Sequence, residues 1–134
     1  MMSDIDRPQV EDIAMAIIPE LNEADNTDWH CYLINMKPRE IEAVLVSSRG
    51  YGEKEDEQIK TSQLRHFLGD MDRDSFRKVE LIPDDLLGLT NQYWVSFYLD
   101  GKMYDKKYLF VPESIQEENL TPVPVIGKKG VLII

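Results

Sequence analysis

Cysteine is almost absent from this 134-residue chain, which contains Cys31 and no other. A single cysteine cannot form an intramolecular disulfide, which is typical of proteins kept in a reducing compartment. Long hydrophobic runs are absent as well. No stretch approaches the roughly 18 uninterrupted apolar residues that a membrane helix needs, and residues 1–8 lack the apolar core of a signal peptide. We therefore expect a cytoplasmic protein without a membrane partner.

Positive charge is also scarce. The chain has 25 acidic residues against 15 basic ones, which gives a net charge of -10. A surface of that sign repels the phosphate backbone on which most nucleic-acid affinity depends. The densest basic clusters, Lys106–Lys107 and Lys128–Lys129, are only pairs. The composition therefore predicts that DNA and RNA are not partners.

Apolar side chains are plentiful enough for a stable core. Hydrophobic residues make up 43% of the chain and charged residues 30%, a balance typical of folded proteins. A length of 134 residues supports one sizeable core and is short for two. We expect a single domain over residues 1–134, with a more extended C-terminal segment at residues 113–134.

Alternation of apolar and polar residues predicts β-strands through the middle of the chain. Residues 29–34 and 41–48 are predicted to be two antiparallel strands joined by a short turn. Apolar residues face both sides of the second strand, which indicates a central position in a sheet. A further strand is predicted at residues 76–82, with Val79 and Leu81 on one face.

The clearest pattern is a hairpin over residues 92–111. Its turn is Asp100-Gly101, a pair that supplies the positive φ angles of a two-residue type I′ turn. The first strand places four apolar side chains on one face: Tyr93, Val95, Phe97 and Leu99. The hairpin holds further aromatic side chains that predict cross-strand aromatic pairs: Tyr98, Tyr104, Tyr108 and Phe110.

Two segments fit either a helix or a strand. In residues 8–18 apolar side chains recur at helical spacing, yet residues 13–18 also fit a buried strand. Asp6, ahead of Arg7-Pro8, would cap a short helix there. Residues 61–71 are ambiguous in the same way, since their apolar side chains fit both periods.

Turn-forming residues separate the remaining elements. The glycines of residues 49–52 are predicted to end the second strand, residues 53–57 to form a solvated acidic loop, and residues 83–89 to include a short helical turn. Five or six antiparallel strands with one or two short helices predict a mainly β fold, an antiparallel immunoglobulin-like sandwich. The alternative is an α+β fold with an antiparallel sheet.

Cys31 is the first candidate for chemistry, as a nucleophile. It alternates onto the same face as Trp29 and Leu33, where a thiol is buried and protonated. Its neighbour His30 points to the opposite face, so only His66 could act as its base. A small buried hydrophobe is the better interpretation.

A second candidate is a metal site. Asp70, Asp72 and Asp74 have the spacing of the first ligands of a calcium-binding loop. The pattern then fails, because Ser75 stands where the loop requires glycine and Leu81 where it requires a bidentate glutamate. We therefore predict a solvated turn, and no metal or other cofactor.

A polar cluster is the third candidate. Arg49, Tyr51, Arg65 and His66 could bind a carboxylate or a peptide end if the fold brings them together, because arginine pairs with carboxylates through two hydrogen bonds. Asp105 could then serve as an acid or base. This arrangement would make a small ligand-binding protein or an enzyme.

The C-terminal residues 131–134 are strongly apolar and β-prone. The favoured interpretation is that they form the last strand of the chain's own sheet. Otherwise the segment at residues 120–134 would add as a strand to a partner, or to another copy of the chain in self-association.

Four segments together resemble a family of short, uncharacterised bacterial domain proteins: Trp29–Asn35, Ser48–Gly52, Leu64–Phe67 and Tyr93–Tyr98. The resemblance covers most of the chain. Some members of that family carry a label taken from the phenylalanyl-tRNA synthetase beta chain. The resemblance implies no functional residue, a synthetase needs far more chain, and the acidic balance opposes tRNA binding.

No catalytic constellation survives these tests, so a non-enzymatic interaction module is the leading hypothesis. It would bind a protein or peptide through a sheet edge or through the aromatic face of the hairpin, where Tyr104 and Tyr108 are the candidate contacts. The alternative is the ligand-binding protein or enzyme built on the cluster of Arg49, Tyr51, Arg65 and His66.

Overall fold

The computed structural model describes residues 8–134, so the predicted cap at Asp6 lies outside the described residues. The described chain is built of strands and two short 3-10 helices. The strands are β1 (Ile13–Leu21), β2 (Thr27–Asn35), β3 (Ile41–Lys54), β4 (Glu57–Lys60), β5 (Leu64–Met71), β6 (Ser75–Ile82), β7 (Thr90–Leu99), β8 (Lys102–Phe110), β9 (Thr121–Pro122) and β10 (Lys129–Ile133). The 3-10 helices are η2 (Asp84–Leu86) and η3 (Glu117–Asn119).

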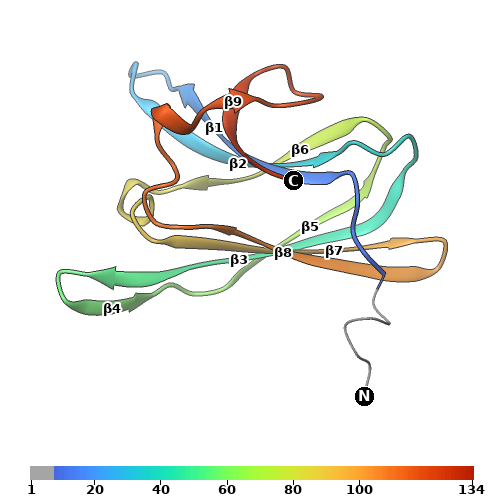
Figure 1. Cartoon of the computed structure of the whole chain (residues 1–134), viewed down its shortest axis with the longest axis horizontal. Coiled ribbons are helices and arrows are strands. Elements are labelled where there is room, and N and C mark those ends of the chain that lie inside the picture. The colour runs from blue at the N-terminus through green and yellow to red at the C-terminus, as the bar shows by residue number, and fades with distance from the viewer. Residues whose placement is uncertain (1–7) are drawn as a thin grey trace.

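The strands form two antiparallel sheets that pack face to face, as Figure 1 shows edge-on. Sheet A has the strand order β6-β2-β1-β10-β9, and sheet B has the order β4-β3-β7-β8 with β5 also paired to β3. The prediction of a mainly β, sandwich-like fold is therefore confirmed, while the expected five or six strands were too few. The immunoglobulin-like connectivity stays a prediction.

The first ambiguous segment, residues 8–18, contains the first part of strand β1, which begins at Ile13. Its residues from Ile13 to Ile18 are all 1% exposed or less, because one face packs between the sheets and the other lies under the C-terminal segment. A strand buried on both faces does not alternate, so its sequence fits a helix equally well. Pro19 is tolerated because the β10 pairing ends at Ile17, which leaves β1 an edge strand there.

The two strands predicted around residues 29–34 and 41–48 both exist, but they do not pair with each other. β2 pairs with β1 and β6 in sheet A, whereas β3 pairs with β4, β5 and β7 in sheet B. The connection between them crosses from one sheet to the other. Local alternation identifies a strand without identifying its partner, which is why the sequence alone suggested a hairpin. The central position predicted for the second strand is confirmed.

β3 also continues through the glycines that were expected to end it. It runs to Lys54 and turns into β4 through Glu55 and Asp56, whose φ angles are 52° and 65°. The predicted acidic loop at residues 53–57 is thus a tight hairpin. Positive φ at two successive residues is what a type I′ turn requires, here without glycine.

The second ambiguous segment contains strand β5, and the strand predicted at residues 76–82 is β6. The expectation that Val79 and Leu81 share a face was wrong. The register of β2 against β6 shifts between Cys31 and Tyr32, so Cys31 lies opposite Glu80 while Tyr32 lies opposite Lys78. This β-bulge turns both Val79 and Glu80 inward and leaves Leu81 exposed.

The hairpin is confirmed as β7 and β8, with Asp100 and Gly101 at φ 54° and 76° in its turn. The predicted aromatic pairs are present: the rings of Phe97 and Tyr104 stack at 5.3 Å, and those of Tyr93 and Phe110 meet edge to face at 6.0 Å. The helical turn predicted at residues 83–89 is also present, as η2.

The C-terminal segment belongs to sheet A. β10 pairs with β1 through Met15, Ala16 and Ile17, as the favoured interpretation expected, so addition of this strand to a partner would require its release from β1. Before β10, Val123 and Ile126 pack against the outer face of sheet A. Figure 1 shows this segment, in red, on the side of sheet A away from sheet B.

No helix within residues 8–134 has the length and apolar character needed to cross a membrane.

Candidate functional site

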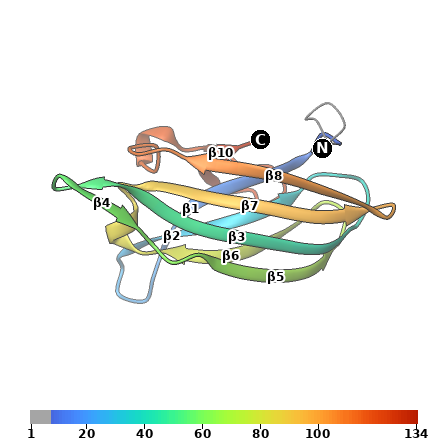
Figure 2. The same ribbon diagram turned by 90° about the horizontal axis from the view of Figure 1, so that it is seen from below.

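The outer face of sheet B is the candidate site. In Figure 2 the strands β5, β3, β7 and β8 lie nearest the viewer, with sheet A behind them. The register defines two rows of outward side chains across these strands. The first row is Arg65, Ser47, Trp94 and Lys107. The second row is Phe67, Leu45, Ser96 and Asp105. Basic, aromatic, aliphatic and small polar side chains therefore share the face with the acidic residue Asp105.

Large apolar side chains stand exposed on this face. The exposed fractions are 71% for Phe67, 52% for Met103, 44% for Tyr98, 41% for Trp94 and 40% for Leu109. Tyr98 lies opposite Met103, and Leu109 lies two residues from Lys107 on the same strand, so these side chains share the outer face with the two rows, and the Ser96–Asp105 pair lies between Tyr98 and Trp94. Several large apolar side chains exposed on one face indicate an interaction site more strongly than single scattered ones do.

Basic side chains lie over two aromatic rings of this face. The Nζ of Lys107 lies 5.1 Å from the ring centroid of Trp94, and the Cζ of Arg49 lies 5.4 Å from that of Tyr51. Both distances are within the range of cation–π attraction, which holds the two side chains over the rings. Asp105 accepts a hydrogen bond of 3.2 Å from Nε1 of Trp94, so the acidic residue of the second row is already engaged.

A shallow depression of about 320 Å³ continues the face beyond the rows. It is lined by Arg49, Tyr51, Gly52, Gln58, Ile59 and Lys60. Within the described residues, the buried Nε of Arg49 has no hydrogen-bond partner. A buried donor without an acceptor is uncommon, and here it lies on a side chain that lines the depression. The depression therefore offers the two cations Arg49 and Lys60 to an anion.

The structure brings together three of the predicted site residues, Arg49, Tyr51 and Arg65, on this outer face. His66 alternates to the inner side of β5 and bonds Glu80. Tyr104 stacks on the buried Phe97, so it faces the core.

Tyr108 is also directed inward. It is 1% exposed, and its hydroxyl donates a 2.6 Å hydrogen bond to the carbonyl of Ile13 in the other sheet. Burial raises its pKa. The outward face of the hairpin is instead formed by side chains that include Trp94, Tyr98, Met103 and Leu109. The sequence contained this signal, since these side chains alternate with the core-facing ones.

A second polar cluster, centred on Glu80, lies between the sheets. The sequence did not predict this cluster. Glu80 Oε1 accepts 2.7 Å hydrogen bonds from Ser48 Oγ and from His66 Nε2, and its Oε2 accepts one of 3.2 Å from the Tyr93 hydroxyl. Cys31 lies beside this cluster and is fully buried. Burial, and then the charge of Glu80, raises the pKa of the Cys31 thiol. The thiol is held protonated, as expected of a buried hydrophobe.

The residues of the predicted turn at 70–74 have structural partners. Asp70 Oδ1 accepts a hydrogen bond from the Ala43 amide, and the Asp72 carbonyl accepts bonds from Asn35 and Ser75. Over residues 8–134, no group of three or more histidine, cysteine, aspartate or glutamate side chains is arranged to hold a metal ion.

Comparison of the chain with protein-family models, with curated proteins and with solved structures gives no match in any of the three.

Proposed function

We propose that the chain is a non-enzymatic interaction module whose outer sheet B face binds an acidic peptide segment that also carries apolar side chains. The observation that supports this most is the exposed patch of Phe67, Trp94, Tyr98, Met103 and Leu109 beside Arg49 and Arg65. Aromatic residues, methionine and arginine are the residue types enriched in protein interfaces. The face therefore has the composition of a recognition surface.

The charge distribution favours an acidic partner. The chain as a whole has a net charge of -10, yet this face carries Arg65, Lys107, Arg49 and Lys60, with the outward acidic residues Glu42 and Glu53 at its ends. Asp105 is engaged by Trp94. A partner of opposite sign is attracted to these cations and repelled by the remaining acidic surface, which orients it on the face. The guanidinium of Arg49 would pair with a carboxylate, which this group binds through two parallel hydrogen bonds.

The apolar patch would supply most of the affinity, and the cations the selectivity. Truncation of a buried aromatic anchor is the change that costs binding most in interfaces. Trp94 is the candidate anchor because it lies in the first row between Ser47 and Lys107, with exposed apolar side chains on its own strand and on the neighbouring ones.

Selection of a display library of short random peptides against the full chain tests this function. The expected result is enrichment of peptides that combine aspartate or glutamate with aromatic or aliphatic residues. Isothermal titration calorimetry with a selected peptide should then show that Trp94→Ala and Arg65→Glu each raise the dissociation constant about tenfold or more.

Two matched controls keep the test specific. Leu21→Ala changes an apolar residue that is 73% exposed at the end of β1 in sheet A, and Arg73→Glu reverses a charge in the exposed turn between β5 and β6. Both should leave peptide affinity unchanged. Selection of basic peptides, selection of none, or equal effects of test and control variants would contradict the proposed function.

A further inference from the structure

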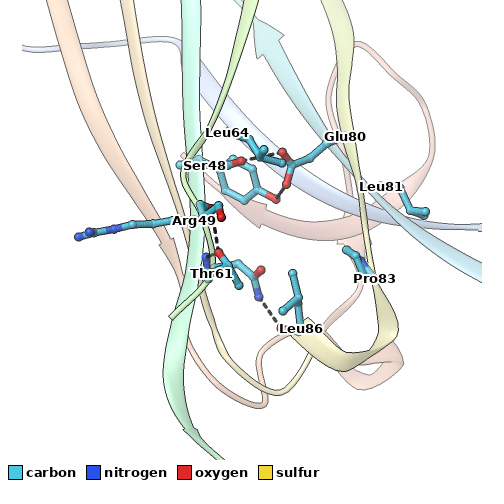
Figure 3. A pocket seen from close by; sticks show the side chains of 12 residues that line it. Ser48, Arg49, Thr61, Leu64, Glu80, Leu81, Pro83 and Leu86 are labelled. Atoms are coloured by element: carbon cyan, nitrogen blue, oxygen red, sulfur yellow. Dashed lines mark hydrogen bonds between the residues drawn. The ribbon is translucent and has the colours of Figure 1, made fainter. Parts of the chain in front are cut away.

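A cavity of about 230 Å³ opens beside Glu80, where the two sheets diverge next to η2. Figure 3 shows Glu80 and Ser48 at one end, Leu86 at the other, and Leu81 and Pro83 along one side. The side chain of Arg49 points away from the cavity, and so belongs to the outer face of sheet B (Figure 3). The cavity is therefore separate from the peptide-binding face.

The space exists because β3 carries small residues on its inner side at this level. Ser48 and Gly50 occupy successive inward positions, and Thr61 lies next to Gly50. A Cβ on Gly50 would meet Thr61 Cγ2 at 3.4 Å and Asn91 Oδ1 at 3.7 Å, which are ordinary contacts. Any larger side chain at this position would occupy the cavity.

One end of the cavity is polar and holds a carboxylate. Glu80 accepts hydrogen bonds from the hydroxyls of Ser48 and Tyr93, which are neutral, and from His66. Within the described residues, His66 Nε2, at 2.7 Å, is the one basic group within salt-bridge distance of Glu80, and no lysine or arginine lies that close. The side chain is 18% exposed, so its charge is largely removed from water. A desolvated carboxylate without a lysine or arginine partner is attracted strongly to a cationic ligand.

The remaining walls are mostly apolar: Leu64, Leu81, Pro83 and Leu86. Hydrogen bonds fix these walls. Asn91 Nδ2 donates to the carbonyls of Leu86 and Leu89, and Thr61 Oγ1 accepts from the Gly50 amide. A preformed cavity with apolar walls and a few converging polar groups is the usual form of a small-ligand site. Its volume lies below the roughly 300 to 1,000 Å³ of drug-sized ligands, so the ligand must be small.

We propose that this cavity binds a primary alkylammonium group, with the ammonium on Glu80 and the alkyl chain against the leucine and proline walls. The ammonium would donate to Glu80 Oε2, which accepts only the longer bond from Tyr93, and to the hydroxyl oxygen of Ser48. Such a group is carried both by a free small amine and by the side chain of a lysine. This binding is independent of the outer-face function.

The test is a titration of the full chain, followed by amide NMR, with n-butylammonium chloride, with n-butanol and with Nα-acetyl-lysine amide. We expect saturable shifts at Ser48, Gly50, Thr61 and Glu80 with the two amines and not with the neutral alcohol. Glu80→Gln should weaken amine binding about tenfold or more, since it removes the charge and retains the shape.

A second variant preserves the test if Glu80→Gln does not fold. Gly50→Ala leaves the carboxylate intact and places a methyl group in the cavity, so it should weaken amine binding several-fold. Gly88→Ala, whose Cβ would meet nothing within 4 Å, is the matched control and should not.

The two amines distinguish the source of the ligand. Tighter binding of the acetyl-lysine amide assigns the cavity to a lysine of a polypeptide, and tighter binding of butylammonium assigns it to a free amine. No saturable shift with either amine, equal shifts with butanol, or amine binding unaffected by Glu80→Gln and Gly50→Ala would overturn the proposal.

Discussion

The two outer faces of the sandwich are built in opposite ways. On sheet A the outer side chains at the centre are Ala14, Ala16 and Ile18, and the C-terminal segment covers them with Val123 and Ile126. On sheet B, in contrast, no strand of the described chain covers the outer side in Figure 2, and large aromatic side chains stand exposed there. One face is completed by the chain itself, and the other is left available.

The charged residues of the two faces also differ in whether they have partners within the chain. On sheet A, Glu20 accepts hydrogen bonds from Tyr32 at 2.7 Å and from Lys128 at 3.0 Å, and Lys78 lies 3.6 Å away. His30 Nδ1 is 3.1 Å from Glu20 without hydrogen-bond geometry. This carboxylate is thus satisfied within the chain. On sheet B, Arg49 and Arg65 have no carboxylate partner in the described residues. On the proposed function, sheet A would contribute stability and sheet B would contribute binding.

Placing a carboxylate on each outer face should give the largest difference in the free energy of unfolding between the two sheets. Val123→Asp buries a carboxylate at a position that is 3% exposed and should lower the free energy of unfolding by about 3 kcal/mol or more. Leu109→Asp makes the same kind of change on sheet B, where the side chain remains in water, and should cost about 1 kcal/mol or less. Urea denaturation followed by tryptophan fluorescence measures both. Equal losses would contradict the comparison.

Gly130→Ala tests how tightly the C-terminal segment packs. A Cβ at this position would lie 2.8 Å from Ile18 Cγ1 and 2.9 Å from the carbonyl oxygen of Ile17. Since a backbone atom must move, we expect a loss of about 1 to 3 kcal/mol in thermal or urea unfolding. Gly88→Ala, which meets nothing within 4 Å, is the control. A Gly130→Ala protein as stable as the control would show that the segment packs loosely.

Glu20 should make the stability of the chain depend on pH. Burial raises the pKa of Glu20, but the hydrogen bonds from Tyr32 and Lys128 and the charges of Lys128 and Lys78 outweigh it and lower the pKa to about 2, against an ordinary 4.5. The stabilisation is therefore fully present above pH 4.5 and is lost as the pH falls toward 2.

Replacement of this residue measures that contribution. Glu20→Gln should cost about 1 kcal/mol at neutral pH, because water screens the two half-exposed lysines. Circular dichroism should follow the unfolding of both the Glu20→Gln and the wild-type proteins. The difference in their free energies of unfolding should shrink as the pH is lowered from 4.5 toward 2. Glu23→Gln, in the exposed turn between β1 and β2, is the control. A pH-independent difference would contradict the assignment.

The smallest effect on stability is expected at Trp94. Trp94→Ala removes an exposed side chain and should change the free energy of unfolding by about 1 kcal/mol or less, while it reduces peptide binding strongly. Urea denaturation provides the measurement. A large loss of stability would show that the ring is part of the fold, not a binding surface.

The parts of the fold that depend on neighbouring residues could be predicted from the sequence. The β7–β8 hairpin follows from the Asp100-Gly101 turn and from simple alternation. The mainly β class and the central position of β3 follow from the same local pattern. The pairing of β2 and β3 with different sheets could not be predicted, because it depends on contacts between residues distant in sequence.

In the candidate sites too, features set by neighbouring residues could be predicted and features set by distant contacts could not. Arg49, Tyr51 and Arg65 were identified from their chemistry, and alternation along β3 places Arg49 and Tyr51 on one face. Glu80 was missed because the bulge opposite Cys31 reverses the alternation of β6 at Val79. A register shift depends on the partner strand, so the sequence of β6 alone did not reveal that a glutamate points between the sheets.

The most direct measurement is amide NMR mapping of an acidic peptide, selected as described above, on the full chain. We expect chemical-shift changes concentrated at the outward residues of β3, β5, β7 and β8, centred on Ser47 and Trp94, and none along the outer residues of β1 and β2. Shift changes confined to sheet A, or to the edge strand β6, would contradict the claim that the uncovered face of sheet B is the binding surface.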